Sequence, residues 1–435
     1  MNFIAYFLIF AVPLFNSSAF AQSTYLSVGN AKTKKPVIAL IETNAASNAL
    51  ALSAQIQKTI DNDLNFIELF KMLPSAGFAQ TKINAAADVK YPEWIKSGAD
   101  FVVYSSTKLE KSGLIFELHV AGMGKNQEVL AKRYTAETSD AKTLAHSAAN
   151  DIVQLITGKK GIFLTKILFA CDKTGKKEIY TMNFDGSDIR QITKIKSITM
   201  APAWNSNGTK IAFSVFNKHS DNNKNLDLFQ YDFASGKLEL LSNKKGINSG
   251  AAYHPDGKRL ALTLSFNGNP DIYFLDIASR VATPFTKSIG FDVDPAFSPD
   301  GSKIAFVSSR AGKPMVYVAP VLNAADAKRL TYAGSYNATP SWSPDAKKLV
   351  FAGWIDGRFD LFTINVDSMQ IDRLTKNEGN NEDPSYSPDG NFITFSSNRS
   401  NGKNIWVMSA DGNSAKRLTF GMGSCVSPKW SPYLN

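Results

Sequence analysis

The sequence predicts a mainly β protein: a six-bladed β-propeller preceded by a small α/β domain. Two markers repeat together, with successive copies 44 to 49 residues apart. One is an aromatic residue just before a turn, at Trp204, Tyr253, Phe297, Trp342, Tyr386 and Trp430. The other is a hydroxyl residue after an apolar run, at Thr193, Ser242, Thr286, Thr331, Thr375 and Thr419. Two markers sharing a period of about 40–45 residues are typical of propeller blades.

The chain begins with an apolar stretch. Residues 3–15 carry no charged side chain, and the triplet Ala19-Phe-Ala21 follows. A short apolar core before a small-x-small triplet predicts a cleaved secretory signal over residues 1–21. A transmembrane anchor is the alternative, but a span needs about 20 apolar residues and Pro13 interrupts this one. We therefore expect an exported protein that does not span a membrane.

A polar arm follows over residues 22–35, and its end is free once the signal is removed. Its few apolar residues alternate with polar ones, so it could add as a strand to a partner's sheet edge. A frayed terminus without a role is the alternative. The candidate partner-binding residues of the arm are Gln22, Ser23, Thr24, Tyr25, Leu26, Ser27 and Val28.

Residues 36–158 are expected to form the α/β domain. A continuous apolar run over residues 37–41 predicts a buried strand, and apolar residues then recur at helical spacing as far as Phe66. Further strands and a closing helix, which ends at Gly158, are expected at residues 100–104, 114–120, 129–134 and 139–157. The domain contains neither a phosphate-binding loop nor a dinucleotide fingerprint.

Residues 159–435 are expected to form the propeller. Its repeats carry hairpin turns such as Pro299-Asp-Gly301, in which Pro fixes φ, Asp bonds its own backbone and Gly takes a positive φ. The first blade lacks an innermost strand, whereas residues 424–432 form an extra strand at the other end. We expect this strand to complete the first blade and close the ring, which leaves no open sheet edge.

The two cysteines lie at this closure. Superposing the repeats places Cys425 nearly opposite Cys171 on antiparallel neighbours, and export permits a disulfide. We therefore predict a Cys171–Cys425 disulfide, subject to the Cα separation that such a bond needs. Two buried free thiols are the alternative.

The composition excludes several function classes. The net charge is +10, but the charges are scattered without a run of five like charges, which argues against a nucleic-acid partner. The four histidines never pair at metal-ligand spacing, and the sequence holds no Gly-x-Ser-x-Gly or His-Glu-x-x-His motif. We expect neither catalytic residues nor a resident cofactor.

The propeller mouth is the expected binding site, since the loops before the innermost strands converge there. These loops are rich in acidic and amide side chains. Three interpretations remain open: turn chemistry with Asx caps, a socket for a partner's basic or amide-rich segment, or oxygen ligands for an axial cation such as Ca²⁺. The candidate residues are Asn248, Gly250, Asp292, Val293, Asp294, Asn337, Thr339, Asn381, Glu382 and Asp383.

Three segments together make the chain similar to a known family. They are the closing helix Leu144–Gly158, the joint Gly161–Phe169 and the stretch Tyr180–Thr193 that leads into the repeats. With them, the chain resembles the TolB family of the Tol-Pal system of Gram-negative bacteria over nearly its full length. One difference is Ile247, where close members of that family tend to carry His.

The resemblance implies a periplasmic, non-catalytic scaffold that links the peptidoglycan-associated lipoprotein Pal to the inner-membrane Tol complex. Such a scaffold supports outer-membrane integrity and constriction at cell division. By resemblance, the arm would contact TolA, Pal would dock over the propeller mouth, and other outer-membrane lipoproteins are further candidate partners. The protein would be a monomer within a heteromeric complex. A periplasmic propeller enzyme, or a sugar- or metal-binding module, is the alternative.

Overall fold

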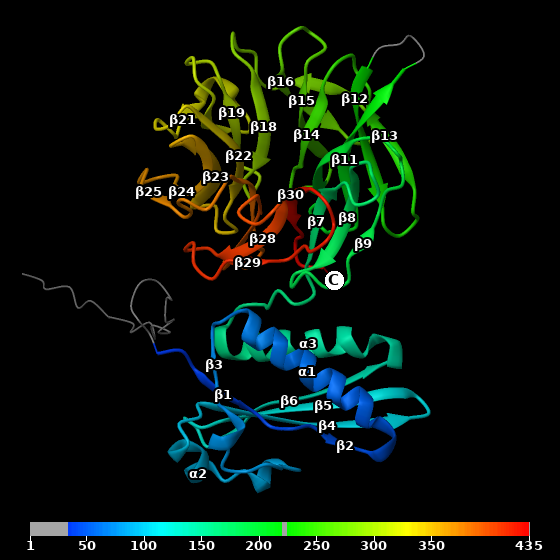
Figure 1. Cartoon of the computed structure of the whole chain (residues 1–435), viewed down its shortest axis with the longest axis vertical. Coiled ribbons are helices and arrows are strands. Elements are labelled where there is room, and N and C mark those ends of the chain that lie inside the picture. Colours follow the sequence, from blue (N-terminus) through cyan, green and yellow to red (C-terminus); the bar gives the residue numbers. More distant parts are fainter. Residues whose placement is uncertain (1–33, 220–223, 435) are drawn as a thin grey trace, which may run out of the picture.

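The computed structural model describes residues 34–219 and 224–434. The predicted signal over residues 1–21 and the candidate arm residues Gln22 to Val28 lie outside these described residues. The described chain forms an N-terminal α/β domain and a six-bladed β-propeller stacked along the long axis of the molecule (Figure 1). The predicted fold class is confirmed.

The N-terminal domain is a mixed sheet with strand order β3-β1-β4-β5-β6, and β2 pairs with β4. Helices α1 and α3 lie between this sheet and the propeller, and α2 lies on the far side of the sheet (Figure 1). The bounds are β1 Val37–Leu40, β2 Asn44–Ala45, α1 Leu50–Phe66, β3 Lys71–Met72, α2 Tyr91–Lys96, β4 Phe101–Glu110, β5 Gly113–Gly122, β6 Gln127–Ala136 and α3 Ala141–Thr157.

Six four-stranded antiparallel sheets, formed by the described residues, make the propeller. From the axis outward, the blades are β30 Cys425–Trp430, β7 Lys166–Cys171, β8 Glu178–Asn183, β9 Arg190–Gln191; β10 Thr199–Trp204, β11 Lys210–Lys218, β12 Lys224–Asp232, β13 Leu238–Ser242; β14 Asn248–Tyr253, β15 Arg259–Leu264, β16 Asp271–Asp276, β17 Ala282–Pro284; β18 Asp292–Phe297, β19 Lys303–Ser308, β20 Met315–Pro320, β21 Lys328–Arg329; β22 Tyr336–Trp342, β23 Lys348–Ile355, β24 Arg358–Asn365, β25 Ile371–Arg373; and β26 Asn381–Tyr386, β27 Phe392–Ser397, β28 Asn404–Ser409, β29 Lys416–Arg417.

The C-terminal strand β30 pairs with β7 and closes the ring. Cys425 is directly opposite Cys171 in this pairing, and a disulfide joins the two residues, whose Cα atoms are 4.1 Å apart. The bond connects positions 254 residues apart in sequence, so it ties the first blade's strand to the end of the chain.

The two sequence markers have physical roles in several blades. The hydroxyl oxygen of Thr286 accepts a hydrogen bond from the backbone N–H of Ile272 at 2.9 Å, and Thr419 does the same for Ile405 at 2.9 Å. These bonds satisfy a strand N–H where the outermost strand ends. The indole N–H of Trp342 donates to the carbonyl of Ala296 in the preceding blade at 2.9 Å, so the aromatic marker links neighbouring blades.

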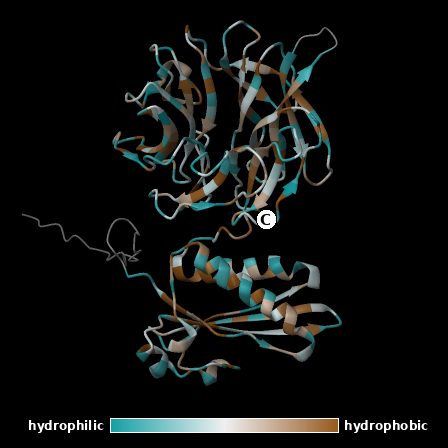
Figure 2. Cartoon of the chain, viewed as in Figure 1, coloured by the Kyte–Doolittle hydropathy of each residue, from teal (hydrophilic) through white to brown (hydrophobic). Residues whose placement is uncertain are grey.

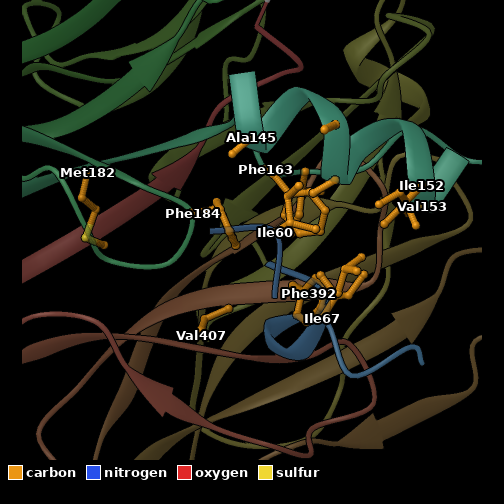
Figure 3. Close-up of a cluster of buried hydrophobic side chains, with 14 of the residues drawn as sticks. Ile60, Ile67, Ala145, Ile152, Val153, Phe163, Met182, Phe184, Phe392 and Val407 are labelled. Carbon is orange, nitrogen blue, oxygen red and sulfur yellow. The ribbon is translucent and has the colours of Figure 1, made fainter. Parts of the chain in front are cut away.

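A continuous apolar core joins the two domains. Phe184, from the turn after β8, is fully buried and meets Phe66 of α1 edge to face with ring centroids 4.9 Å apart. Figure 3 shows Phe163, Phe184 and Phe392 within the same cluster as side chains of α3. Lys416 and Glu68 form an ion pair of 2.7 Å at the edge of this joint.

The hydropathy of the residues differs between the strands and the loops at the far end of the propeller. Figure 2 shows hydrophobic residues concentrated on the strands, whereas the loops at the end of the propeller far from the N-terminal domain are largely hydrophilic or mixed. Among residues 34–219 and 224–434, no helix is long and apolar enough to cross a membrane.

Candidate functional site

The mouth of the propeller lies at the end of the ring opposite the N-terminal domain. The joint involves the turn before β29, which contains Ser414, and the turn after β8. In an up-and-down four-stranded blade, these turns lie at the end where the innermost strand finishes. The loops that precede the innermost strands therefore surround the free mouth.

Each innermost strand contains a β-bulge at an equivalent position. The residue at the break has a positive φ: Ala201 (49°), Gly250 (64°), Asp294 (54°), Thr339 (49°), Asp383 (55°) and Ser427 (54°). Proline follows every one of them except Gly250. Proline costs no ladder hydrogen bond here, because the free edge of the innermost strand faces the axis. The bulges therefore form a ring around the channel.

Two carboxylates of this ring lie in a network across neighbouring blades. Oδ2 of Asp383 accepts hydrogen bonds from the backbone N–H of Ser427 at 3.1 Å and from the hydroxyl of Ser396 at 3.3 Å. Oδ2 of Asp294 accepts from the backbone N–H of Thr339 at 3.4 Å. Each carboxylate is thus held by the bulge of the next blade, which fixes its place in the channel.

Lys429 of β30 interacts electrostatically with both carboxylates. Burial raises the pKa of the Asp294 carboxyl, and the ammonium of Lys429 opposes this effect. Burial likewise lowers the pKa of Lys429, against the attraction of Asp383 and Asp294. The Lys429 amino group therefore lies near the place where the sequence suggested an axial cation.

The predicted mouth residues separate into two groups. Asn248, Asp292, Asn337 and Asn381 are buried at equivalent positions and bind groups of their own or adjoining loops and strands. For example, Oδ1 of Asn248 accepts from the N–H of Lys244 at 3.0 Å, and Arg310 forms an ion pair of 3.1 Å with Asp292. These four side chains support the rim and are not presented to a partner. The half-buried group that lines the mouth consists of Gly250, Val293, Asp294, Thr339, Glu382 and Asp383.

Sequence reasoning missed Ser427 and Lys429. The signal was present, because Ser427 follows Asp383 by the same 44 residues that separate the aromatic markers Tyr386 and Trp430. The sequence of the C-terminal strand predicts closure of the ring, and its axial residues become apparent when it is aligned with the other innermost strands.

Metal ligation has little support in the described part of the chain. Among residues 34–219 and 224–434, no group of three or more His, Cys, Asp or Glu side chains could hold a metal ion. The arrangement at the mouth is better suited to binding polar and cationic groups of a macromolecule, since its carboxylates are fixed and partly exposed.

Comparisons with known proteins agree with this architecture. A family model described as the TolB beta propeller domain matches residues 153–353 and 337–434, and one described as the TolB amino-terminal domain matches residues 24–129. A "Protein TolB homolog" of Chlorobaculum tepidum is 34% identical over 246 residues, covering 56% of this chain and 55% of the relative. A "Tol-Pal system protein TolB" of Desulfosudis oleivorans is 33% identical over 259 residues, covering 58% of each.

The matched region thus spans little more than half the length of these curated relatives. Among solved structures, TolB from Acinetobacter baumannii superposes with a TM-score of 0.80 at 24% identity, covering 92% of this chain and 98% of that chain. At this identity the likeness shows the fold alone.

Proposed function

This chain belongs to the TolB family, and from that premise we propose that it is a non-catalytic periplasmic scaffold of the Tol-Pal system. It would link the lipoprotein Pal, bound at the propeller mouth, to the inner-membrane Tol complex, reached through TolA. Curated relatives are named Tol-Pal system protein TolB, which supports the choice of system. The link would hold the envelope layers together and assist constriction at division.

The observation that carries this proposal is the set of fixed, partly exposed carboxylates at the free mouth. Glu382 is half-buried and paired with Lys403 at 2.5 Å, and Asp383 lies next to it at the bulge. Among the described residues, Oδ1 of Asp383 has no hydrogen-bond partner, so it is free to accept a donor from another protein. Because these groups are already held in place, binding would cost little ordering entropy.

The test is capture of Pal by the purified chain and by a variant carrying Glu382→Ala and Asp383→Ala. We expect Pal affinity to fall by roughly 30-fold, since hot-spot truncations cost about 2 kcal/mol. A matched control carries Glu137→Ala and Asp372→Ala, which remove two exposed carboxylates far from the mouth. Equal Pal binding by all three proteins would refute the assignment of the mouth.

The other half of the link is tested with the same preparation. The chain lacking residues 22–33, which lie outside the described residues, should lose TolA while it keeps Pal and its thermal midpoint. Unchanged TolA affinity would rule out the role of the arm. We propose no catalytic function, because the chain belongs to a family of non-catalytic Tol-Pal components.

A further inference from the structure

The loops around the mouth differ in charge between the two halves of the ring. On the half formed by blades β18–β21 to β26–β29, several cationic side chains are paired with carboxylates, whereas the exposed Lys313 and Lys376 have no carboxylate within 4.0 Å among the described residues. Arg310 binds Asp292 at 3.1 Å, Arg399 binds Glu378 at 2.8 Å, and Lys403 binds Glu382 at 2.5 Å. The charges of this half therefore cancel in part.

The opposite half carries exposed lysines, which we call the lysine arc: Lys173, Lys176, Lys194, Lys196, Lys244 and Lys245. Within residues 34–219 and 224–434, none of them lies within 4.0 Å of a carboxylate. The nearby Glu178 and Asp227 are each only 2% exposed. Glu178 accepts a hydrogen bond from the backbone N–H of Lys196 at 2.7 Å, so this carboxylate supports the loop from below its surface.

The loops of the lysine arc lie side by side. The backbone N–H of Thr199 donates to the carbonyl of Lys177 at 2.9 Å, which joins the loop after β7 to the loop before β10. Phe216 and Leu226 are opposite each other on β11 and β12, and the N–H of Leu226 donates to Gly246 at 3.1 Å. The loops that carry the lysines therefore adjoin one another along the rim, across neighbouring blades.

Large apolar side chains alternate with these lysines. Ile198, Phe216, Ile247 and Phe266 are between 36% and 39% exposed, and Ile289 in the next loop is fully exposed. The ammonium of Lys244 lies 5.1 Å from the centre of the Phe266 ring. A set of lysines without a carboxylate partner among the described residues, together with exposed isoleucine and phenylalanine side chains, has the chemistry of peripheral membrane-binding surfaces.

A protein partner fits this band less well. Lysine is depleted in protein–protein interfaces, whereas arginine is enriched there, and the arc contains lysine only. Clusters of four to eight basic residues are instead attracted to anionic bilayers. The N-terminal domain occupies the opposite face of the propeller, so the arc is free to approach a flat surface (Figure 1).

We infer that the lysine arc docks the propeller onto an anionic phospholipid bilayer. The ammonium groups contact lipid phosphates, and Ile198, Ile247 and Ile289 enter the headgroup layer. The half of the mouth that contains Glu382 and Asp383 remains open to a protein. This contact goes beyond the scaffold role and does not depend on it, because it needs only this chain and lipid.

The test is co-sedimentation of the full chain with vesicles of phosphatidylcholine alone or of equal parts phosphatidylcholine and phosphatidylglycerol. The variant carries Lys173→Glu, Lys176→Glu, Lys194→Glu and Lys245→Glu. Lys196 is left unchanged because its φ is positive, and Lys244 because it covers Phe266. The matched control reverses the same number of charges in the N-terminal domain, at the exposed residues Lys58, Lys82, Lys108 and Lys111.

We expect the wild type and the control to bind the anionic vesicles, and to do so more weakly as salt rises. The arc variant should bind at least about 100-fold more weakly, since each lysine near an anionic bilayer strengthens binding roughly fivefold. All three chains share the apolar residues 3–15, so these cannot produce a difference between them.

Two outcomes would overturn the inference. One is equal binding of the arc variant and the control to anionic vesicles. The other is binding of soluble polyglutamate, but not of vesicles, by the wild type, which would assign the arc to an acidic protein. Pal capture by the arc variant is measured in parallel. If the arc variant still captures Pal but no longer binds vesicles, the two surfaces are separate. If no chain captures Pal, the result contradicts the scaffold role and leaves the lipid contact unaffected.

Discussion

The two ends of the propeller are built from the same repeats but are used differently. At the end near the N-terminal domain, the repeats finish in similar Ser-Pro-Asp turns. In one of them Asp300 accepts a hydrogen bond from Ser298 at 2.5 Å and from Ser302 at 2.7 Å, which lowers the pKa of Asp300 to about 2. At the mouth, equivalent positions hold different residues, such as Ile247 and Asn380. The residues that repeat therefore build the blades, and the residues that vary between repeats give the mouth its surface.

The chemistry of the two ends differs as well. The joint with the N-terminal domain is apolar and closed around Phe184, whereas the mouth is polar and partly open. Apolar burial contributes most of the stability at the first end, and fixed charges provide recognition at the second. Changes at the joint should therefore affect the stability and shape of the molecule, and surface changes at the mouth should affect binding.

The largest effect on stability is expected at the disulfide that closes the ring, next to the mouth. Replacing Cys171 and Cys425 by Ala removes a cross-link between residues 254 apart in sequence. The chain-entropy model assigns about 5 kcal/mol to a loop of this size. We expect a lower midpoint of thermal unfolding for the double variant in oxidising buffer.

The wild type provides the control for this prediction. Once its disulfide is reduced, the wild-type midpoint should fall toward that of the double variant, whose own midpoint should not respond to the reductant. A reduced wild type with two titratable thiols and an unchanged midpoint would show that β30 closes the ring without help from the bond.

A somewhat smaller loss of stability is expected at the joint between the two domains. Phe184→Ala removes a fully buried ring that contacts Phe66 and Phe163, so it should lower the free energy of unfolding by about 4 kcal/mol. It should also loosen the two domains, which small-angle scattering would record as a larger radius of gyration. Pal binding at the distant mouth should persist.

Phe306→Ala is the matched control, because Phe306 is fully buried within blade β18–β21 and away from the joint. It should lose comparable stability without a change in the radius. If both variants kept the wild-type radius, Phe184 would contribute packing energy but would not hold the domains together.

The position of the blades could be predicted from the sequence because their markers follow a strict period. The register of the repeats also placed Cys425 opposite Cys171, as the strands pair in the structure. These features depend on local turn chemistry and on alternation along strands, both of which are readable from residue types.

The division of the mouth residues could not be predicted in the same way. Asp292 and Asp294 are two residues apart, so regular alternation would place both side chains on one side of the strand. The bulge at Asp294 breaks this alternation, and Asp292 is buried while Asp294 reaches the channel. The packing of Phe184 against Phe66 depends on the docking of two domains, which no local pattern records.

The smallest of the expected effects concerns a buried pair just behind the joint. Oδ2 of Asp63 on α1 lies 2.7 Å from Nδ1 of His146 on α3, and both side chains are buried. The His146 ring also meets Phe184 edge to face, with centroids 5.9 Å apart. Burial raises the pKa of Asp63 to about 6, although His146 and Lys142 favour its charged form; Asp185 adds to the increase.

The raised pKa gives the joint a defined pH dependence. Between pH 4 and about pH 6 the folded protein keeps a proton on Asp63 that the unfolded chain, with a value near 3.8, has released. The stability that this group contributes is therefore fully present below the pKa of the unfolded chain. It is lost as pH rises through about 6, and the loss amounts to about 3 kcal/mol of unfolding free energy. Asp63→Asn removes the titration, so the unfolding free energy of the wild type relative to this variant should fall from pH 4 to pH 7.

Asp61→Asn, which replaces an exposed carboxylate of the same helix, is the control, and the wild type measured relative to it should show no such fall. If the unfolding free energies of the wild type and of Asp63→Asn changed with pH in parallel, the Asp63 carboxyl would have the same pKa in the folded and unfolded states, which would contradict this prediction.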